Sequence, residues 1–508
     1  MTLNSNYEVK SNNYYRGLVD KAYVIGKQKL QDKIRQDRPA SVSLQMDGWT
    51  AAHTGYMGAI CDYINDNWER ESVVLACNPY TVRHSSEKIA DWMIALVKDW
   101  QLNYVLDVVT TDSAANMLGI FNLENFPDYY RSAQCANHLL QRVIENEIFS
   151  MKSIKTLIEN VRIVTNFASS SNNFCHDLEE IQKKEDPDKT PLLLVNDVQT
   201  RWNSTYSMLA RFLKLKESLT ILLAKKEWSR KASLAKAKIC QEDFTLMERV
   251  VKVLQAFNEV TEQLSHNSAC ISEVIPVVTI LLAALDRGND DLGVVGYKFN
   301  LRSKLREKMG HFESIDIYSL ATLVDPRYRR TYFTDKTKAK TATKKLVSLI
   351  NAEIEMEVPA FDDTLPCPVV AERETETANL QQSGSIIQQI AKKIRMEEEE
   401  RNVEMEAGVV TAESLVELYL KEPLQEHKPL SYWKLYEKNA GNCKVKAAFL
   451  SVVKKLLTPP ATSTNVERLF SIAGLISDKR RKKLLPQRLE KILFLRENLY
   501  MLSFKLEW

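Results

Sequence analysis

The sequence predicts an α/β fold in which a mixed β-sheet near the N-terminus is followed by a long α-helical region. Runs with strand periodicity alternate with helical patterns up to about residue 145, and helical patterns then follow one another for about 300 residues. Glycine is also scarce, with 14 residues in 508, which argues against β-sandwiches and propellers. These observations favour a sheet of modest size joined to a large helical body.

The first elements come in an order that mixes hairpins with crossover units. Residues 1–40 read as a short, polar, helical lead-in. We expect strands at 42–46, 56–64, 72–80, 105–109 and 129–135, and helices at 85–100, at 113–120 and from about 138. Strands joined first by hairpins and then through helices build a mixed sheet flanked by helices.

The region after residue 145 is expected to be helical with one interruption. Helical spacing recurs at 209–223, 250–264 and 274–285, and it resumes at 412. Residues 366–411 read as a mobile linker or solvated loop with a helical piece, because they contain a Gln-Gln-Ser-Gly stretch and a run of four glutamates.

Charge, cysteine and hydropathy patterns narrow the class of protein. The 69 basic and 66 acidic residues give a net charge of +3, which excludes a histone-like protein but permits local basic faces. None of the 8 cysteines forms a Cys-x-x-Cys pair, so a reducing compartment is the simplest interpretation. The longest apolar run, 274–285, is shorter than the ~20 residues of a membrane span. We therefore expect a cytosolic or nuclear protein that does not enter membranes.

Three carboxylates stand out, and each has an ordinary structural alternative. Asp47 follows the first expected strand, where Asp-Gly is also a common hairpin turn. Asp112 follows a buried strand and could instead cap the next helix. Glu467 fits a capping box in which Thr464 is the N-cap.

Taken together, the three carboxylates suggest one site. Asp47 and Asp112 can sit side by side if their strands pair, because functional groups gather at strand ends in such sheets. With Glu467 they would form an all-oxygen site of the kind that holds Mg²⁺ or Mn²⁺, and two such ions support in-line displacement at a phosphodiester. The spacing of the three carboxylates suggests such a site but is not a specific signal for it.

Several sequence blocks resemble those of hAT-superfamily transposases, in order and over about residues 40–500. The blocks are Met46-Asp47-Gly48-Trp49-Thr50, Thr111-Asp112-Ser113-Ala114-Ala115-Asn116-Met117, Cys135-Ala136-Asn137-His138, Arg201-Trp202-Asn203-Ser204-Thr205, Leu323-Val324-Asp325-Pro326-Arg327-Tyr328 and Ser431-Tyr432-Trp433. The most specific block, from Pro460 to Ser471 and then Ala473-Gly474, is similar to the hAT C-terminal dimerisation region. Within the superfamily, the sequence most resembles the transposase-derived proteins that usually begin with a BED zinc finger.

The resemblance implies an RNase H-like core interrupted by a large α-helical insertion. It would divide the chain into the lead-in 1–40, a first part of the core at 41–145, the insertion at 146–444, and a core completion with the dimerisation region at 445–508. It implies a DDE active site of Asp47, Asp112 and Glu467, which would hold two Mg²⁺ or Mn²⁺ ions. Members of the family cut DNA at transposon ends, leave hairpins on the flanking DNA and join the freed ends to a target.

Two further motifs are carried over by the resemblance. Cys135 and His138 match a Cys-x-x-His motif near the family's active site, although two ligands alone do not make a zinc site and core packing is the alternative. Arg201 and Trp202 match an Arg-Trp motif whose indole is placed near the cleaved DNA, where it would stack on an extruded base. Without the family, Trp202 would be a packing residue at a helix start.

The sequence also departs from the family pattern. No Cys-x-x-Cys with a His-x₃₋₅-His partner occurs, so the BED finger is expected to be missing, and only about 40 residues precede the first catalytic block. Sequence-specific binding to transposon ends is therefore in doubt, whereas the three carboxylates of the family's active site are all present.

Three segments are rich in basic residues. They are 211–238, 327–345 and the run Lys479, Arg480, Arg481, Lys482 and Lys483. Such segments neutralise DNA phosphates, and ordinary solvated helix faces are the alternative for the first two. For 479–483 we favour DNA contact or a nuclear-import signal.

The sequence thus leaves two main functions and a third, weaker one. The first is a hAT-type transposase or its nuclease remnant, which acts on DNA, forms a dimer or higher homo-oligomer and works in the nucleus. The second is a domesticated derivative that binds DNA or protein partners and dimerises without cleaving DNA. The third is a helical scaffold that keeps only the dimerisation block. Nucleotide-binding motifs of the Walker and Rossmann types are absent from the sequence.

Overall fold

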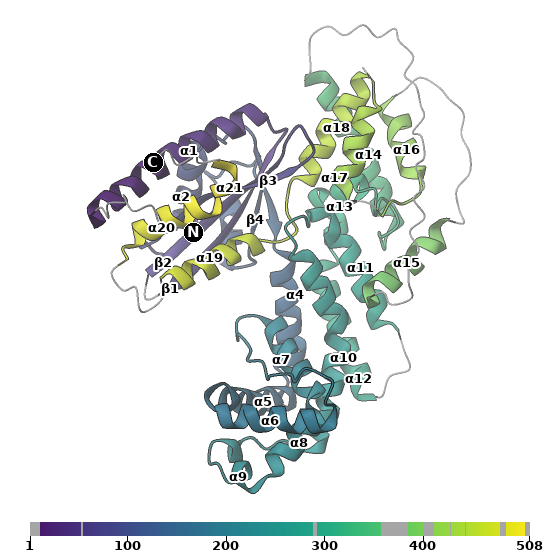
Figure 1. Ribbon diagram of the computed structural model, residues 1–508. Helices are drawn as coiled ribbons and strands as arrows, with labels where there is room; N and C mark the ends of the chain where they lie inside the picture. The colour runs from purple at the N-terminus through teal and green to yellow at the C-terminus, as the bar shows by residue number, and fades with distance from the viewer. Residues whose placement is uncertain are drawn as a thin grey trace.

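The computed structural model has a sheet with its covering helices on one side and a helical body on the other (Figure 1). It describes residues 11–51, 54–287, 292–356, 385–399, 411–426, 428–441, 443–477 and 484–502. Statements about the structure refer to these residues.

A five-stranded mixed sheet forms the first part of the fold. The strands are β1 (Val42–Ala51), β2 (Thr54–Ile64), β3 (Arg70–Pro79), β4 (Leu106–Thr111) and β5 (Arg131–Gln134). Their order is β3-β2-β1-β4-β5, with antiparallel pairing among β1, β2 and β3 and parallel pairing of β1 with β4 and of β4 with β5. The predicted mixed sheet is confirmed, and so is each of its expected strands to within a few residues.

Alternation along β1 gives the sheet two different faces. Val42, Leu44 and Met46 are buried in one core together with residues of α1 (Asn12–Asp37) and α2 (Ser86–Asp99). The opposite face carries polar side chains at the centre of the sheet and an apolar cluster at β2 and β3. That cluster packs against helices from the other end of the chain.

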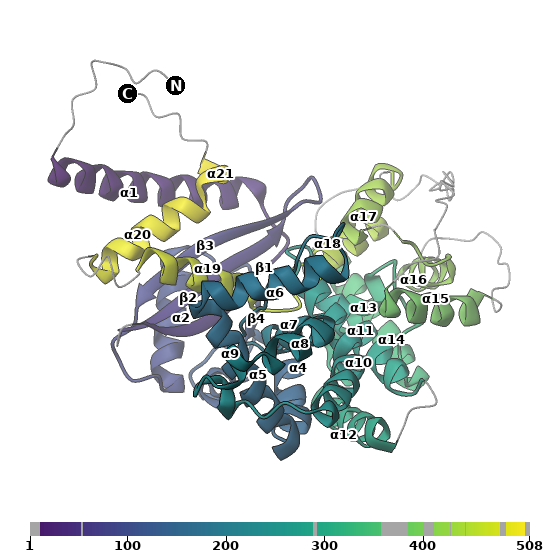
Figure 2. The same ribbon diagram turned by 60° about the horizontal axis from the view of Figure 1, so that its bottom comes forward.

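The C-terminal helices return to cover this second face. They are α19 (Thr464–Ile476), α20 (Pro486–Glu497) and α21 (Leu499–Leu502), and Figure 2 shows α20 and α21 beside α1. Asn498 is buried, and its side-chain amide donates to the Val74 carbonyl (2.9 Å) and accepts from the Val74 N–H (3.0 Å). The Asn498 side chain therefore takes the hydrogen bonds of the Val74 backbone on the edge strand β3, at a point where the register of β3 with β2 shifts.

The rest of the described chain is mostly helical, as expected. Its longer helices are α4 (Ala136–Ile144), α5 (Lys152–Ser170), α6 (Asn172–Glu185), α7 (Trp202–Lys214), α8 (Lys216–Ala224), α10 (Gln241–Leu264), α11 (Val274–Leu285), α12 (Leu292–Met309), α13 (Asp316–Val324), α14 (Lys336–Met356), α15 (Ile386–Glu399), α16 (Ala412–Lys421), α17 (Pro429–Lys438) and α18 (Lys444–Leu457). α5 to α9 (Lys226–Ser229) form a lower lobe in Figure 1. α18 packs on α13 and α14, and α19 packs on β1 and β2.

Two further expectations concern the linker at 366–411 and membrane-spanning helices. Within the expected linker 366–411, the helical piece is α15, and its remaining residues except 385 and 411 lie outside the described residues. No helix among the described residues is long and apolar enough to cross a membrane.

Candidate active site

Asp47 and Asp112 lie next to each other because of the parallel pairing of β1 and β4. The last paired residues of these strands are Met46 and Thr111, and the two aspartates are the next residues along each strand. Neighbouring strands run about 4.8 Å apart, so the two aspartates occupy adjacent strand positions. The condition under which the two aspartates can sit side by side, that their strands pair, is met.

The hairpin-turn alternative for Asp47 is wrong. β1 does not end at Asp47-Gly48 but continues to Ala51, and Asp47 is paired with Gly58 of β2 inside the ladder. The Gly48 N–H donates to Asp47 Oδ1 at 2.7 Å, which fixes the carboxylate close to its own backbone.

Asp112 keeps part of its ordinary role. Its Oδ1 accepts from the Ala114 N–H at 3.2 Å, in the turn that leads into the short helix α3 (Ala115–Leu118). The N-cap of α3 is Ala114 and not Asp112. Asp112 therefore holds this turn with one oxygen, and its side chain is only half-buried.

Glu467 lies in the first turn of α19, but the predicted capping box does not form. The N-cap is Ser463, and no side chain caps this helix start. Instead, Glu467 Oε2 lies 3.6 Å from Arg201 Nη2. Its side chain is therefore engaged in an ion pair with the start of α7 rather than in its own helix end.

Gly58 allows α19 to approach the sheet beside Asp47. A Cβ atom at Gly58 would lie 2.6 Å from Val466 Cγ1 and 2.8 Å from Phe470 Cζ. Trp49 of β1 stacks on Phe470, with ring centroids 5.6 Å apart. A glycine on the strand next to Asp47 thus lets the helix that carries Glu467 rest directly on the sheet.

The start of α4 joins the strand end that precedes Asp112 to the helix that carries Glu467. The Cys135 N–H donates to the Thr111 carbonyl (2.8 Å), and the next N–H, that of Ala136, donates to the Ala461 carbonyl (3.1 Å). Asn137 Nδ2 reaches Thr464 Oγ1 at 3.5 Å. The Cys-x-x-His segment therefore joins the end of β4, which precedes Asp112, to the segment that leads into α19, which carries Glu467.

The helical body also contacts the start of α4 and the segment that leads into α19. Cys270 and Pro460 form an isolated antiparallel bridge, in which the Ile271 N–H donates to the Pro459 carbonyl at 2.9 Å. Asn137 Nδ2 also donates to Ser265 Oγ (2.9 Å), at the end of α10. The position of α19 is thus fixed by the sheet and by the helical body at once.

Burial, with a smaller contribution from the neighbouring carboxylates, raises the pKa values of Asp47 and Glu467. Burial, reinforced by Asp112 and by Glu467, raises the pKa of Asp47 to about 8, against the opposing hydrogen bond from the Gly48 N–H. Burial also raises the pKa of Glu467, while the cationic Arg201 and the nearby His138 act in the opposite direction. The three carboxylates thus form one interacting group that a cation would stabilise.

The donor set suits a hard divalent cation, although the side chains are not gathered around one point. Asp47, Asp112 and Glu467 offer only oxygen atoms, which Mg²⁺ and Mn²⁺ prefer. Among the described residues, no group of three or more His, Cys, Asp and Glu side chains is arranged to hold a metal ion as it stands. The chemistry of the donors fits, and closure around an ion would need rotation of side chains.

Cys135 is a buried residue at the N-cap position of α4, and burial raises its pKa to about 11. Such a thiol stays protonated at neutral pH, as in the core-packing alternative. His138, one turn further on, is half-buried and lies close enough to Glu467 to influence its pKa.

Arg201 and Trp202 have different environments although they are neighbours. Arg201 is exposed, pairs with Glu467 and donates to Ser471 Oγ at 3.3 Å. Trp202 is only 2% exposed and packs in the core of the helical body, where its indole Nε1–H has no hydrogen-bond partner among the described residues. The five predicted basic residues at 479–483 lie outside the described residues.

The sequence did not indicate how the segment before Arg201 is held. Asp197 belongs to this segment, and its side chain is buried. Its carboxylate accepts hydrogen bonds from Arg162 (2.6 Å) and from Thr205 Oγ1 (2.8 Å). The pKa of Asp197 is lowered because these interactions outweigh burial. The only available signal was its position four residues before Arg201. Gly58 and Asn137 were missed in the same way, because their roles depend on contacts distant in sequence.

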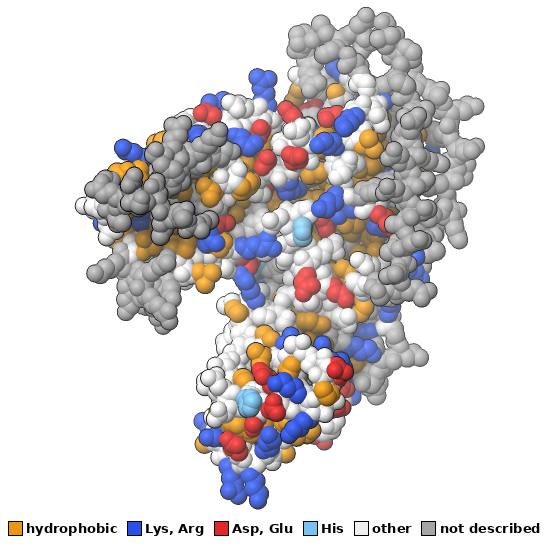
Figure 3. Space-filling view, in the orientation of Figure 1, with side chains coloured by type: hydrophobic (Ala, Val, Ile, Leu, Met, Phe, Trp, Pro, Cys, Tyr) orange, Lys and Arg blue, Asp and Glu red, His pale blue; other side chains and the backbone are white. Residues whose placement is uncertain are grey.

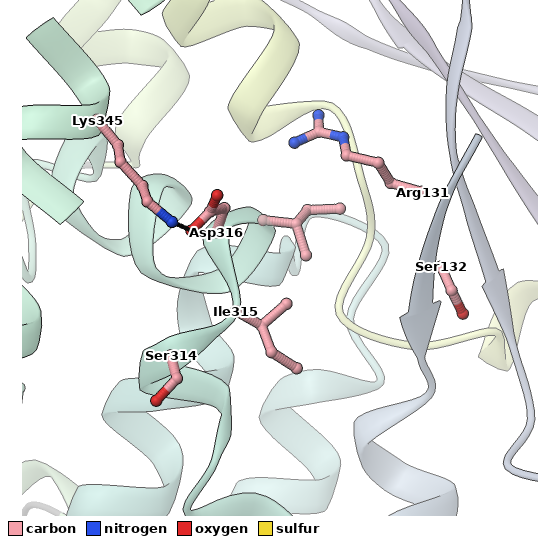
Figure 4. A pocket seen from close by; sticks show the side chains of 7 residues that line it. Arg131, Ser132, Ser314, Ile315, Asp316 and Lys345 are labelled. Atoms are coloured by element: carbon pink, nitrogen blue, oxygen red, sulfur yellow. Dashed lines mark hydrogen bonds and ion pairs between the residues drawn. The ribbon is translucent and has the colours of Figure 1, made fainter. Parts of the chain in front are cut away.

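A cavity lies away from the three carboxylates, between β5 and the start of α13 (Figure 4). It has a volume of about 470 Å³, and its lining includes Arg131, Ser132 and Lys345. Both cations are already paired, Arg131 with Asp107 and Lys345 with Asp316 (2.6 Å).

The fold and the site together define an RNase H-like protein in which a long helical region separates the mixed sheet from the C-terminal helices that cover it. Comparison with known families gives the same result in more detail. Residues 45–124 match the ZBED1 RNase-like domain, residues 133–253 match the ZBED1 RNase-like helical domain, and residues 415–499 match the hAT family C-terminal dimerisation region. These three matches, in this order along the chain, support a hAT transposase-derived protein.

The relatives are named as transposases, as BED-finger proteins and, in one case, as a transcriptional regulator. The chain is 24% identical over 385 residues to human zinc finger BED domain-containing protein 4, covering 74% of this chain and 30% of the relative. It is 25% identical over 346 residues to a Zea mays protein named as a candidate AC transposase, covering 65% of this chain and 41% of the relative. A Talaromyces stipitatus protein named as a candidate transcriptional regulator is 21% identical over 496 residues, with 89% of this chain and 53% of the relative covered. The chain thus spans about half or less of the length of these relatives.

Proposed function

We propose that this protein is a hAT-type DDE transposase or nuclease that cleaves DNA strands and transfers them in a metal-dependent reaction. The observation that supports this proposal most is the register of β1 and β4, which puts Asp47 and Asp112 on adjacent strand positions, with the Glu467 helix resting on the same sheet. The raised pKa values of Asp47 and Glu467, caused first by burial and then by neighbouring carboxylates, support a cation as the partner of this group.

In this proposal the three carboxylates bind Mg²⁺ or Mn²⁺ and thereby set the place of the reaction. When bound, such ions activate a water or hydroxyl and stabilise the leaving oxygen of a phosphodiester. Arg201 holds the Glu467 carboxylate at the start of α19 and presents a cation at the rim, where a phosphate of the substrate can pair with it. Asp47 is half-buried, and the hydrogen bond from the Gly48 N–H (2.7 Å) holds its carboxylate close to the backbone.

Assembly, DNA binding and location follow from the same proposal. The match to the hAT dimerisation region favours a homo-oligomer, a dimer or higher, and DNA is the expected substrate. A protein with this activity would work in the nucleus. Trp202 would stack on an extruded base only if the start of α7 moved, because its indole is buried.

A second candidate function is a domesticated derivative that dimerises and binds DNA without cleaving it. It is favoured by the relatives named as BED-finger proteins and as a transcriptional regulator. The presence of Asp47, Asp112 and Glu467 favours the catalytic proposal instead.

The two functions can be separated by a cleavage assay on the full chain. We expect the purified protein with Mn²⁺ to nick or join DNA that carries the terminal repeats of its own element. Asp47→Asn and Glu467→Gln should abolish the products, whereas Asp91→Asn, a change of an exposed carboxylate, should not. A wild-type protein that binds this DNA but yields no metal-dependent product would point to the domesticated derivative.

A further inference from the structure

The lower lobe of the helical body ends in a strongly basic segment. Residues 225–238 include α9 and the short helix η3 (Leu234–Lys236), and Figure 1 shows α9 at the far end of this lobe from α19. The basic side chains of this segment are Lys225, Lys226, Arg230, Lys231, Lys236 and Lys238. Figure 3 shows Lys and Arg side chains at the lower end of the same lobe.

Most of these cations are not neutralised by the protein. Lys225 pairs with Asp177 at 3.4 Å. The other five are exposed, and no ion pair joins their side chains to a carboxylate among the described residues. Glu227 is the single acidic residue within the segment. We call Lys226, Arg230, Lys231, Lys236 and Lys238 the basic tip.

The backbone that carries the basic tip is firmly anchored. Trp228 is buried, its Nε1–H donates to Asp177 Oδ2 at 2.8 Å, and its ring packs edge-on against Phe174 with centroids 5.2 Å apart. Leu234 is also buried, and Asn160 Nδ2 donates to the Lys238 carbonyl at 3.1 Å. The cations therefore project from a fixed backbone, so little backbone entropy is lost when they bind.

The side chains of the segment indicate the kind of partner. Protein interfaces are usually centred on aromatic or aliphatic anchors, but here Trp228 and Leu234 are turned into the core. What remains on the surface of 225–238 is lysine, arginine, serine, alanine and one glutamate. Concentrated positive charge without apolar anchors suits a phosphate backbone, where cations act through the release of counterions.

The place of the basic tip in the lobe relates it to the candidate active site. α7 begins next to Arg201, which pairs with Glu467, and runs into the lobe that carries the tip. Its 13 residues span roughly 20 Å at 1.5 Å per residue, which is less than one ~34 Å turn of DNA. A duplex of more than one turn is therefore longer than α7, the helix that leads from Arg201 into the lobe.

We propose that the basic tip is a second DNA-contact surface, which grips the phosphate backbone of the duplex that extends away from the candidate active site. This inference rests on the proposed function in one respect: the DNA end is taken to lie at the carboxylates. The basic tip would add affinity without sequence preference, because phosphate contacts position DNA but do not read its bases.

The test is equilibrium binding of the full chain to labelled duplexes of about 12 and about 40 base pairs over a range of salt concentrations. Lys226→Ala, Arg230→Ala and Lys231→Ala are combined in one variant. The matched control combines Lys21→Ala, Lys98→Ala and Lys438→Ala, three exposed lysines of α1, α2 and α17 that lie outside the basic segments and have no carboxylate partner among the described residues. All binding is measured in EDTA, so a chain that cannot cleave DNA still tests the proposal.

We expect the tip variant to bind the long duplex on the order of tenfold more weakly, with a salt slope smaller by about 2 to 3, while the control changes little. Thermal unfolding and circular dichroism would show that both variants fold. Unchanged binding of the long duplex, or an equal loss in the control, would overturn the proposal. Intact DNA binding with a loss of binding to polyglutamate would instead indicate an acidic protein partner. Failure of cleavage by the wild-type protein, measured separately with Mn²⁺, would affect only the proposed function.

Discussion

Arg201 and Glu467 form an ion pair across 266 positions of the chain, with 3.6 Å between Arg201 Nη2 and Glu467 Oε2. One residue stands at the start of α7 in the helical body, and the other stands in the first turn of α19 on the sheet. The pair therefore links the helical body to the third carboxylate of the candidate active site. Both side chains are partly exposed, so the value of the pair lies in position more than in stability.

Replacing Arg201 should therefore separate function from stability. Arg201→Ala should change the free energy of unfolding by no more than about 1 kcal/mol, because an exposed ion pair contributes little. Metal-dependent cleavage should fall on the order of tenfold or more, since about 1.4 kcal/mol of lost positioning is enough for a tenfold change. Arg201→Lys should recover part of the rate. Equal cleavage rates in Arg201→Ala and the wild type would rule out a positioning role.

Gly58→Ala tests whether the close approach of α19 matters. The new Cβ would lie within 3.0 Å of Val466 and Phe470, so α19 must shift. We expect a loss of about 1–3 kcal/mol in stability, as for overpacking of a core, and a loss of cleavage although no carboxylate is changed. Gly17→Ala is the matched control, because nothing lies within 4 Å of the added atom and alanine favours a helix. A fully active Gly58→Ala protein would show that Glu467 tolerates displacement of its helix.

Divalent metal should stabilise the protein through the three carboxylates. A ligand that binds only the folded state at ten times its Kd adds about 1.4 kcal/mol to the free energy of unfolding. We expect Mn²⁺ to raise the thermal unfolding midpoint of the wild type and EDTA to reverse the shift. The double variant Asp47→Asn with Asp112→Asn should show no shift. A shift of the same size in the double variant would place the metal elsewhere.

Asp62 should make stability depend on pH. Burial raises the pKa of Asp62, against hydrogen bonds from Ser72 (2.6 Å) and Gln45 (2.7 Å) and the nearby Arg70. Because the folded pKa lies above the unfolded value of about 3.9, the folded state holds its proton more tightly. The stabilisation that this proton gives is complete below the unfolded pKa and is lost as pH rises through the folded pKa.

Asp62→Asn removes this titration, since asparagine stays neutral at every pH. Measured by thermal unfolding from pH 4 to pH 8, the variant should gain stability relative to the wild type as pH rises. Asp66→Asn, a change of a highly exposed carboxylate nearby, serves as the control and should follow the wild type. A constant difference between Asp62→Asn and the wild type over this range would contradict the prediction.

Much of the fold followed from local patterns. The alternation of Val42, Leu44 and Met46 predicted β1, and the short buried run before Asp112 predicted β4. The pairing of these strands made Asp47 and Asp112 neighbours, as the sequence suggested. The same local reasoning failed at Glu467, whose capping box was credible from spacing but does not form, because its carboxylate lies beside Arg201 from a distant helix.

The sequence by itself determined the order of strands and helices, the three carboxylates and the basic segments, because periodicity and residue type act over short stretches of chain. Only the tertiary structure decided that Gly58 makes room for α19, that Cys135 and Ala136 join two ends of the site, and that Trp202 is buried. It also decided that the cations of 225–238 face solvent while Trp228 holds them in place. These relationships depend on which distant surfaces pack together, and that choice is made by the burial of apolar area across the whole fold.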